Sequence, residues 1–171
     1  MRKRKVALIT GSTSGIGLAI ARELAKNNVD IALNGFGNMS IISQIVKEVR
    51  NIGVNCNYYK VDISKSTHVK KMIPKIIKDF GGLNILVNNA GIQHISSIEK
   101  FDVKKWDQVI ATNLSSAFYS IRYTLPYMKK IKWGRIINIS SVHGLVASTN
   151  KAAYIASKHG IIGLTKAVAL E

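Results

Sequence analysis

Short apolar runs alternate with longer segments of helical period along the chain, and this alternation limits the folds available to it. The runs occupy residues 5–10, 29–35, 54–62, 83–91 and 134–140. The longer segments occupy residues 17–28, 40–53, 65–80, 103–130 and 152–171. Apolar residues recur there at the spacing of one helix face. Strict alternation of strand and helix favours a parallel sheet with helices on both faces and ligands beyond the carboxyl ends of the strands.

We therefore predict an α/β fold with a Rossmann-like, doubly wound parallel sheet of about five strands. At 171 residues and 47% hydrophobic content, residues 1–171 suit a single domain with a substantial core. The one cysteine, Cys56, cannot form a disulfide within the chain, and nothing near it has metal-ligand spacing. No apolar stretch is long enough to span a bilayer. These features predict a cytoplasmic protein without a metal site.

The net charge of +16 raises nucleic acid as a partner. The basic residues, however, are scattered over runs such as "RKRK", "VKKM" and "MKKIKW". None of these runs is interleaved with aromatic residues as a single-strand binding groove would be. We interpret the charge as a solvated, lysine-rich surface and expect nucleic acid to be an unlikely partner. A non-specific nucleic-acid binder stays open as an alternative.

The first strand-to-helix connection reads "TGSTSGIG" at residues 10–17. Glycine tolerates positive φ and lets a ligand approach the backbone, and the amides that begin the next helix can face a phosphate. We therefore expect a cofactor to contact Gly11, Thr13, Gly15, Ile16 and Gly17. The spacing is neither the common dinucleotide motif nor a P-loop. A plain tight turn is the alternative.

Cofactor choice depends on the end of the second strand, where an acid would bind ribose hydroxyls and a base would hold a 2′-phosphate. The sequence "LNGFGN" offers neither, so we expect NAD rather than NADP. Phe36 is expected to pack on the adenine, with ordinary core packing as the alternative. Asp62 and Ile63 follow the third strand, where the carboxylate could accept from the adenine amino group. Asp62 could equally cap a helix.

Four motifs in order resemble the short-chain dehydrogenases/reductases: "TGSTSGIG", "NNAG", a serine thirteen residues before a tyrosine, and "YIASK". The resemblance extends from Lys5 to Glu171. The segments "NNAGIQH" and "SSVHGLVASTNKAAYIASKHG" are most similar to the bacterial D-3-hydroxybutyrate dehydrogenases of that family. The resemblance implies an NAD-dependent oxidoreductase that moves hydride between a small 3-hydroxy acid, 3-hydroxybutyrate, and nicotinamide.

Tyr154 and Lys158 of "YIASK" stand four residues apart and share one face of a helix. An ammonium about 4 Å from a forming phenolate stabilises it by roughly 4 kcal/mol at an effective dielectric constant of about 20. Tyr154 would thus serve as general acid and base. A surface tyrosine beside a solvated lysine is the alternative. Both residues are also expected to contact the cofactor.

Three further sites follow from the resemblance. Ser141, rather than its neighbour Ser140, would hydrogen-bond the substrate oxygen, because adjacent strand residues point to opposite faces. Asn113 lies inside a predicted helix, which it would distort, and it would join Lys158 and water in a proton relay. The alternative for Asn113 is a capped helix break. Backbone atoms of "NNAG" would lie against the cofactor, at Asn89, Ala90 and Gly91.

The substrate carboxylate would be held by Gln93, His143 and Lys151, the positions that grip it in the resembled dehydrogenases. Each also has an ordinary role as a surface amide, a loop histidine or a solvated charge.

The family continues past the "YIASK" helix with further strands, so the resemblance implies that the C-terminal strands are missing. We then expect the fifth strand to be an open edge and the "YIASK" helix to lose packing. A truncated, catalytically inactive remnant that still binds cofactor is therefore an alternative. A homodimer or homotetramer through the two long helices is expected by analogy.

Overall fold

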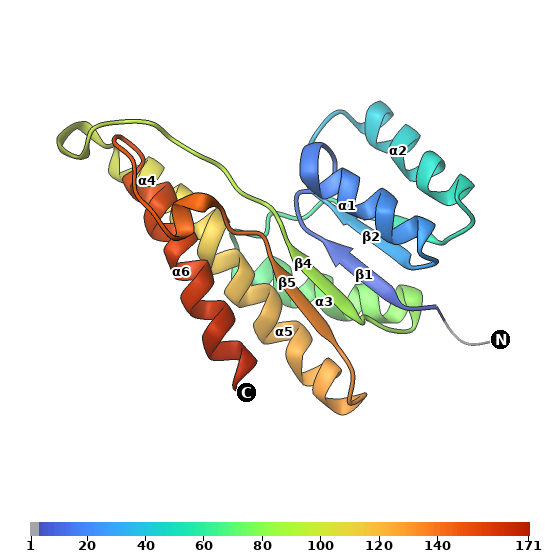
Figure 1. The fold of residues 1–171 in the computed structure, drawn as a ribbon. Coiled ribbons are helices and arrows are strands. Elements are labelled where there is room, and N and C mark those ends of the chain that lie inside the picture. The colour runs from blue at the N-terminus through green and yellow to red at the C-terminus, as the bar shows by residue number, and fades with distance from the viewer. Residues whose placement is uncertain (1–3) are drawn as a thin grey trace.

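The protein is described by a computed structural model that covers residues 4–171 (Figure 1). Its centre is a five-stranded sheet with the strand order β3-β2-β1-β4-β5, and every neighbouring pair is parallel. The strands are β1 (Val6–Ile9), β2 (Asp30–Asn34), β3 (Cys56–Tyr59), β4 (Ile85–Asn88) and β5 (Arg135–Asn138). The predicted doubly wound parallel sheet is confirmed.

Burial explains why these runs form strands. Every residue of β1, β2 and β4 is buried, as expected for strands covered on both faces. β5 lies at one edge of the sheet and is only partly covered. The open edge expected for the fifth strand is thus present.

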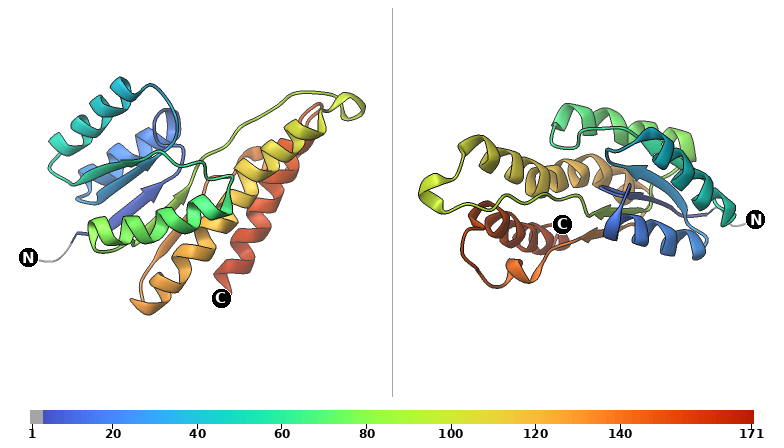
Figure 2. Two further views of the ribbon diagram at one scale, coloured as in Figure 1. Left: turned by 180° about the vertical axis from the view of Figure 1, so that it is seen from behind. Right: turned by 90° about the horizontal axis from the view of Figure 1, so that it is seen from above.

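Helices cover both faces (Figure 2). The helices are α1 (Gly15–Lys26), α2 (Met39–Asn51), α3 (Ser66–Phe80), α4 (Val103–Ile110), α5 (Ser116–Lys130) and α6 (Ala152–Ala169). Buried residues of α1 and α2 form one core with their face of the sheet. Buried residues of α3 and α5 form the other core on the opposite face. No helix within residues 4–171 is long and apolar enough to cross a membrane.

The predicted helix over residues 103–130 is continuous but changes its winding in the middle. A π-helical turn, Ala111–Ser115, joins α4 to α5 and has Asn113 at its centre. π-Helical turns are rare in proteins, and those that occur are often found at functional sites. The chain passes through the turn without a capped break, so Asn113 distorts the helix as expected.

Candidate active site

Glycine geometry shapes the β1–α1 connection at the carboxyl end of the sheet. Gly11 and Gly15 have φ values of 63° and 54°. A Cβ atom at Gly11 would lie 2.8 Å from the Ala90 Cα. At Gly17 it would collide with the Gly11 carbonyl oxygen and lie 2.5 Å from the Asn89 Nδ2. Close packing of this turn against the β4 loop therefore requires glycine.

The turn presents the first amides of α1 to solvent. Ser14 is the N-cap of α1 but makes no side-chain capping bond. A Cβ at Gly15 would meet no atom within 4 Å, and Ile16 is 66% exposed. The first four amides of a helix lack intrahelical partners and attract anions. This open cradle fits the pyrophosphate of a dinucleotide.

Thr10 and Asn89 join the glycine turn to the loop after β4. The Asn89 and Ala90 amides donate to the Thr10 Oγ1 at 3.0 and 3.1 Å. The Asn89 Nδ2 donates to the carbonyl oxygens of Thr10 and Gly11 at 2.9 and 3.1 Å. Sequence reasoning missed Thr10, whose only signal was a polar residue at the end of an apolar run. The side chain of Asn89 fixes the loop whose backbone was expected to face the cofactor.

The loop after β2 brings Phe36 beside the glycine turn. The Thr13 Oγ1 donates to the Phe36 carbonyl oxygen at 2.8 Å. Residue Phe36 is 59% exposed, so ordinary core packing, its alternative role, is wrong. Phe36 and Asp62 line one hollow of about 410 Å³. This placement is compatible with an adenine-binding site.

Asp62 does not cap a helix. Its Oδ1 accepts from the backbone amide of Ser64 at 3.0 Å and from the Ser64 hydroxyl at 2.7 Å. The N-cap of α3 is Lys65. Ile63, which follows Asp62, is buried at 6% exposure, so its side chain belongs to the core. An adenine contact from Ile63 would have to come from its backbone.

Lys158 is a buried lysine of α6. The residue is only 5% exposed. The Nζ donates to the Ile139 carbonyl oxygen at 2.8 Å and lies 5.6 Å from the centroid of the Tyr154 ring. None of the ion pairs formed by residues 4–171 includes it. Burial lowers the pKa of Lys158 below its usual range.

A hydrogen-bonded chain connects Asn113 to the backbone of α6. The Asn113 Nδ2 donates to the Ser157 Oγ at 3.1 Å, and the Ser157 hydroxyl donates to the Tyr154 carbonyl oxygen at 2.7 Å. Ser157 is fully buried. Sequence reasoning overlooked it, although it stands inside the "YIASK" motif. Its bonds hold the helix that carries both Tyr154 and Lys158.

Ser140 and Ser141 are engaged differently. The Ser140 hydroxyl donates to the Lys158 carbonyl oxygen at 3.1 Å. The Ser141 Oγ accepts from the His143 backbone amide at 3.2 Å, and its own proton has no acceptor among residues 4–171. Ser141 is therefore the serine with a free donor. This supports the choice of Ser141 over Ser140.

The three residues expected to hold a carboxylate come from two connections, Gln93 from the one after β4 and both His143 and Lys151 from the one between β5 and α6. The rings of His143 and Tyr154 meet edge to face with centroids 6.1 Å apart. The His143 Nε2 is 2.8 Å from the Ser148 Oγ. Lys151 is the N-cap of α6, and Gln93 is exposed in the loop after β4. The Ser96 amide donates to the Asn150 carbonyl oxygen at 3.0 Å, and this bond joins the loop after β4 to the loop before α6.

Within residues 4–171, no cluster of side chains suits a metal ion.

Comparison with known proteins identifies the family of this chain. The family model for short chain dehydrogenase matches residues 5–171. D-beta-hydroxybutyrate dehydrogenase of Rhizobium meliloti is 54% identical over 98% of this chain and 65% of its own length. The protein of the same name from Cupriavidus necator is 50% identical over 100% of this chain and 66% of its length. The chain thus spans about two thirds of these relatives.

The fold agrees as well. A crystal structure described as a short-chain alcohol dehydrogenase from Sinorhizobium meliloti superposes with a TM-score of 0.92 at 28% identity. The superposition covers 97% of this chain and 66% of that one. Short-chain dehydrogenases are oxidoreductases that bind a nicotinamide cofactor and act on small molecules, and this chain belongs to their family.

Proposed function

We propose that this chain carries the cofactor site and catalytic residues of an NAD-dependent oxidoreductase that acts on a small 3-hydroxy acid such as 3-hydroxybutyrate. The identities of 54% and 50% to proteins named D-beta-hydroxybutyrate dehydrogenase support the substrate class. The proposal treats residues 1–171 as one cofactor-binding domain. It also includes a homodimer or homotetramer formed through α5 and α6.

The observation that carries the proposal is the position of Lys158. A buried ammonium that is held by a carbonyl oxygen, close to a tyrosine ring and outside every ion pair of residues 4–171, is costly for a fold to keep. Its charge is available to stabilise a phenolate at Tyr154. The cost of burying Lys158 is understandable if the charge serves catalysis.

In the proposed reaction, Tyr154 takes the proton of the substrate hydroxyl and returns it in the reverse direction. The free hydroxyl proton of Ser141 would hydrogen-bond the substrate oxygen. Both polar atoms of the Asn113 side chain are occupied, so Asn113 would reach the proton relay through its backbone carbonyl. When bound, a nicotinamide supplies the hydride acceptor.

The chain's own residues would hold this cofactor at three places. The start of α1, with Gly15 and Ile16, would take the pyrophosphate, and the loop with Ala90 and Gly91 would border the nicotinamide half. Phe36 and Asp62 would flank the adenine. The loop after β2 offers no cation for a 2′-phosphate, which supports NAD over NADP.

The proposed site for the substrate carboxylate consists of Gln93, His143 and Lys151. An amide, an imidazole and an ammonium can each donate to an anion, and a charged donor roughly doubles the strength of a hydrogen bond. The link between Ser96 and Asn150 supports this grouping, because it holds the loop of Gln93 near the loop of Lys151.

Calorimetry with NAD and NADP, followed by a spectrophotometric assay with both enantiomers of 3-hydroxybutyrate, tests the proposal. We expect NAD to bind at least about tenfold more tightly than NADP. We also expect NAD reduction with the D enantiomer. NAD binding without turnover would favour the inactive, cofactor-binding alternative. A folded chain that binds neither cofactor would overturn the proposal.

A further inference from the structure

The amino ends of β1, β4 and β5 meet on the side of the sheet opposite to the glycine turn (Figure 1). A hollow of about 390 Å³ lies at this end. It is bordered by the start of β1, the connection between α3 and β4, the end of α5 and the connection between α5 and β5. The hollow therefore shares no residue with the candidate active site.

The hollow is lined by cations and by no acid. Arg4 and Lys5 line it, and none of its lining residues within residues 4–171 is acidic. The Arg4 Nε donates to the Asn28 Oδ1 at 2.6 Å, and the Nη1 lies 3.8 Å from the Asp30 Oδ1. These contacts hold the guanidinium in place, and its Nη2 has no partner among residues 4–171. One guanidinium nitrogen thus remains free to donate to a ligand.

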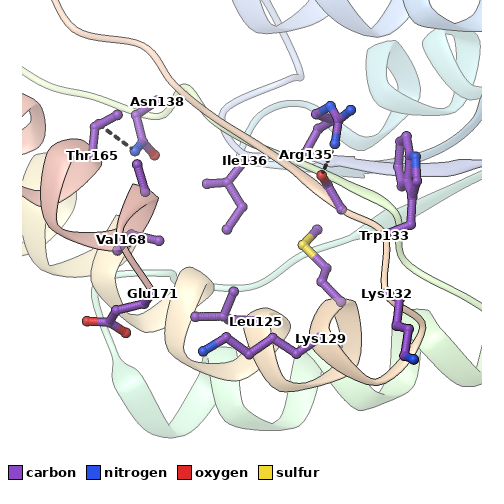
Figure 3. A pocket seen from close by; sticks show the side chains of 13 residues that line it. Leu125, Lys129, Lys132, Trp133, Arg135, Ile136, Asn138, Thr165, Val168 and Glu171 are labelled. Carbon is purple, nitrogen blue, oxygen red and sulfur yellow. Dashed lines mark hydrogen bonds between the residues drawn. The ribbon is translucent and has the colours of Figure 1, made fainter.

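Trp133 gathers two cations around its ring. The Lys5 Nζ lies 3.5 Å from the ring centroid, and the Arg135 guanidinium carbon lies 5.0 Å from it (Figure 3). Neither Lys5 nor Arg135 forms an ion pair with a described residue. Like charges at one ring repel each other. An anion in the hollow beside Lys5 would offset this repulsion.

Two neutral donors converge at Gly82. A Cβ atom at Gly82 would lie 3.1 Å from the Tyr127 hydroxyl oxygen and 3.8 Å from the Asn84 Oδ1. The Tyr127 hydroxyl makes no hydrogen bond among residues 4–171. Asn84 uses only its Oδ1, which accepts from the Val6 amide at 3.0 Å, so its Nδ2 is free within the same part of the chain. A ligand with several acceptor oxygens would satisfy both donors.

We propose that this hollow binds the phosphate group of a small organic molecule. Two cations and two neutral donors around a space without an acid suit a dianion with several acceptor oxygens. The volume lies in the range of small-molecule sites, so there is room for an organic part beside the phosphate, against the Trp133 ring. The proposal does not depend on cofactor binding or dehydrogenase activity.

Inorganic phosphate and phenyl phosphate are the probes. Titrating the 15N-labelled 171-residue chain with either should shift the indole signal of Trp133 and the amide signals of Gly82 and Asn84. The indole signal of Trp106 on α4 should stay in place. We expect phenyl phosphate to bind at least about threefold more tightly than inorganic phosphate, because its ring adds contact with Trp133. Sodium chloride at the same ionic strength should not reproduce these shifts.

Single substitutions remove one donor at a time. Tyr127→Phe keeps the ring and should weaken phenyl phosphate binding at least about fivefold. Its control, Tyr119→Phe on the same helix, should bind within about twofold of the original chain. Lys5→Gln should weaken binding at least about fivefold. Its control is Lys47→Gln on α2, an exposed lysine outside every ion pair of residues 4–171, which should also stay within about twofold.

Gly82→Ala tests the space itself. The added methyl group would lie 3.1 Å from the Tyr127 hydroxyl oxygen, where the phosphate is proposed to bind. We expect at least about a tenfold loss of affinity, with circular dichroism checking that the fold is kept. If this variant does not fold, Tyr127→Phe and Lys5→Gln decide the matter, and binding unaffected by both would overturn the proposal.

The same titrations separate this hollow from other anion sites. Shifts confined to Gly15 and Ile16 would place the anion at the glycine turn and overturn the proposal. Equal shifts with sodium chloride would show charge screening alone and would also overturn it. Equal affinities for the two phosphates would overturn the organic part of the ligand. Shifts at Trp133 with a DNA duplex but with neither phosphate would identify a different class of partner and contradict a small-molecule site.

Discussion

The side chain of Asn113 pairs with the backbone of Ile92 through two hydrogen bonds. The Ile92 amide donates to the Asn113 Oδ1 at 2.8 Å, and the Asn113 Nδ2 donates to the Ile92 carbonyl oxygen at 2.9 Å. Asn113 is 3% exposed and also reaches Ser157 on α6. One amide group thus holds together the π-turn, the loop after β4 and the helix with the proposed catalytic tyrosine.

Replacing Asn113 with alanine should therefore destabilise the fold around the candidate site. Three hydrogen bonds are lost, and the backbone groups of Ile92 lose their partner, so we expect the free energy of unfolding to fall by about 2 kcal/mol. Chemical denaturation monitored by circular dichroism measures this change. The control is Asn51→Ala at the exposed end of α2, which should change stability by less than about 0.5 kcal/mol. Equal effects of the two variants would contradict the role of Asn113.

Lys158→Met should separate stability from function. Methionine keeps much of the length of the side chain and removes a buried charge, so we expect the free energy of unfolding at pH 7 to rise by about 1 kcal/mol. Denaturation curves at a series of pH values measure the difference between the two proteins. Any dehydrogenase activity should be lost in the same variant, because the ammonium is removed.

The sign of the pH dependence follows from the direction of the pKa shift. Burial lowers the pKa of Lys158 in the folded chain, whereas the unfolded chain has a value of about 10.4. Between these values the unfolded chain holds a proton that the folded chain has released, so stability rises with pH through this window. The advantage of Lys158→Met should shrink as pH rises through it. A constant advantage across that window would contradict a lowered pKa.

The alternation of apolar runs predicted the strands and helices because a parallel sheet buries its strands on both faces. The runs at β1, β2 and β4 are continuous for this reason and were readily found. The edge strand β5 was found by the same signal, although it is partly exposed. The sequence did not predict how exposed the end of α6 would be, because exposure depends on which elements pack against it.

The order of the site motifs was readable from sequence, but their mutual support was not. Thr10 and Ser157 contribute through hydrogen bonds to residues distant along the chain. A single threonine or serine in the sequence does not by itself indicate such a role. The exposure of Phe36 was equally hidden, because a phenylalanine near a strand end is compatible with either core packing or a ligand site. Such roles arise only when the sheet brings the loops together.

Gly17→Ala should damage the glycine turn. The added Cβ would collide with the backbone at Gly11 and the side-chain amide of Asn89, and a backbone neighbour cannot easily move aside. We expect a loss of about 2 kcal/mol in the free energy of unfolding. Thermal and chemical denaturation measure it, and NAD titration should show weaker binding.

Gly163→Ala provides the matched control for that variant. Gly163 lies inside α6, and a Cβ there would meet no atom within 4 Å. Alanine favours helix over glycine by about 1 kcal/mol, so this variant should be more stable than the original chain. If both alanine variants changed stability in the same direction, close packing of the turn would not explain the need for glycine at position 17.

Tyr154→Phe removes only the hydroxyl group that is proposed to exchange a proton with substrate. Loss of a general acid and base should lower any turnover by a factor of about 10² to 10⁴, while NAD binding stays within about twofold. The assay with D-3-hydroxybutyrate and calorimetry with NAD measure the two quantities separately. Tyr119→Phe, a partly buried tyrosine of α5 without a hydroxyl hydrogen bond among residues 4–171, is the control and should keep both. Unchanged turnover in Tyr154→Phe would show that proton transfer takes another route, because phenylalanine at this position cannot accept the proton.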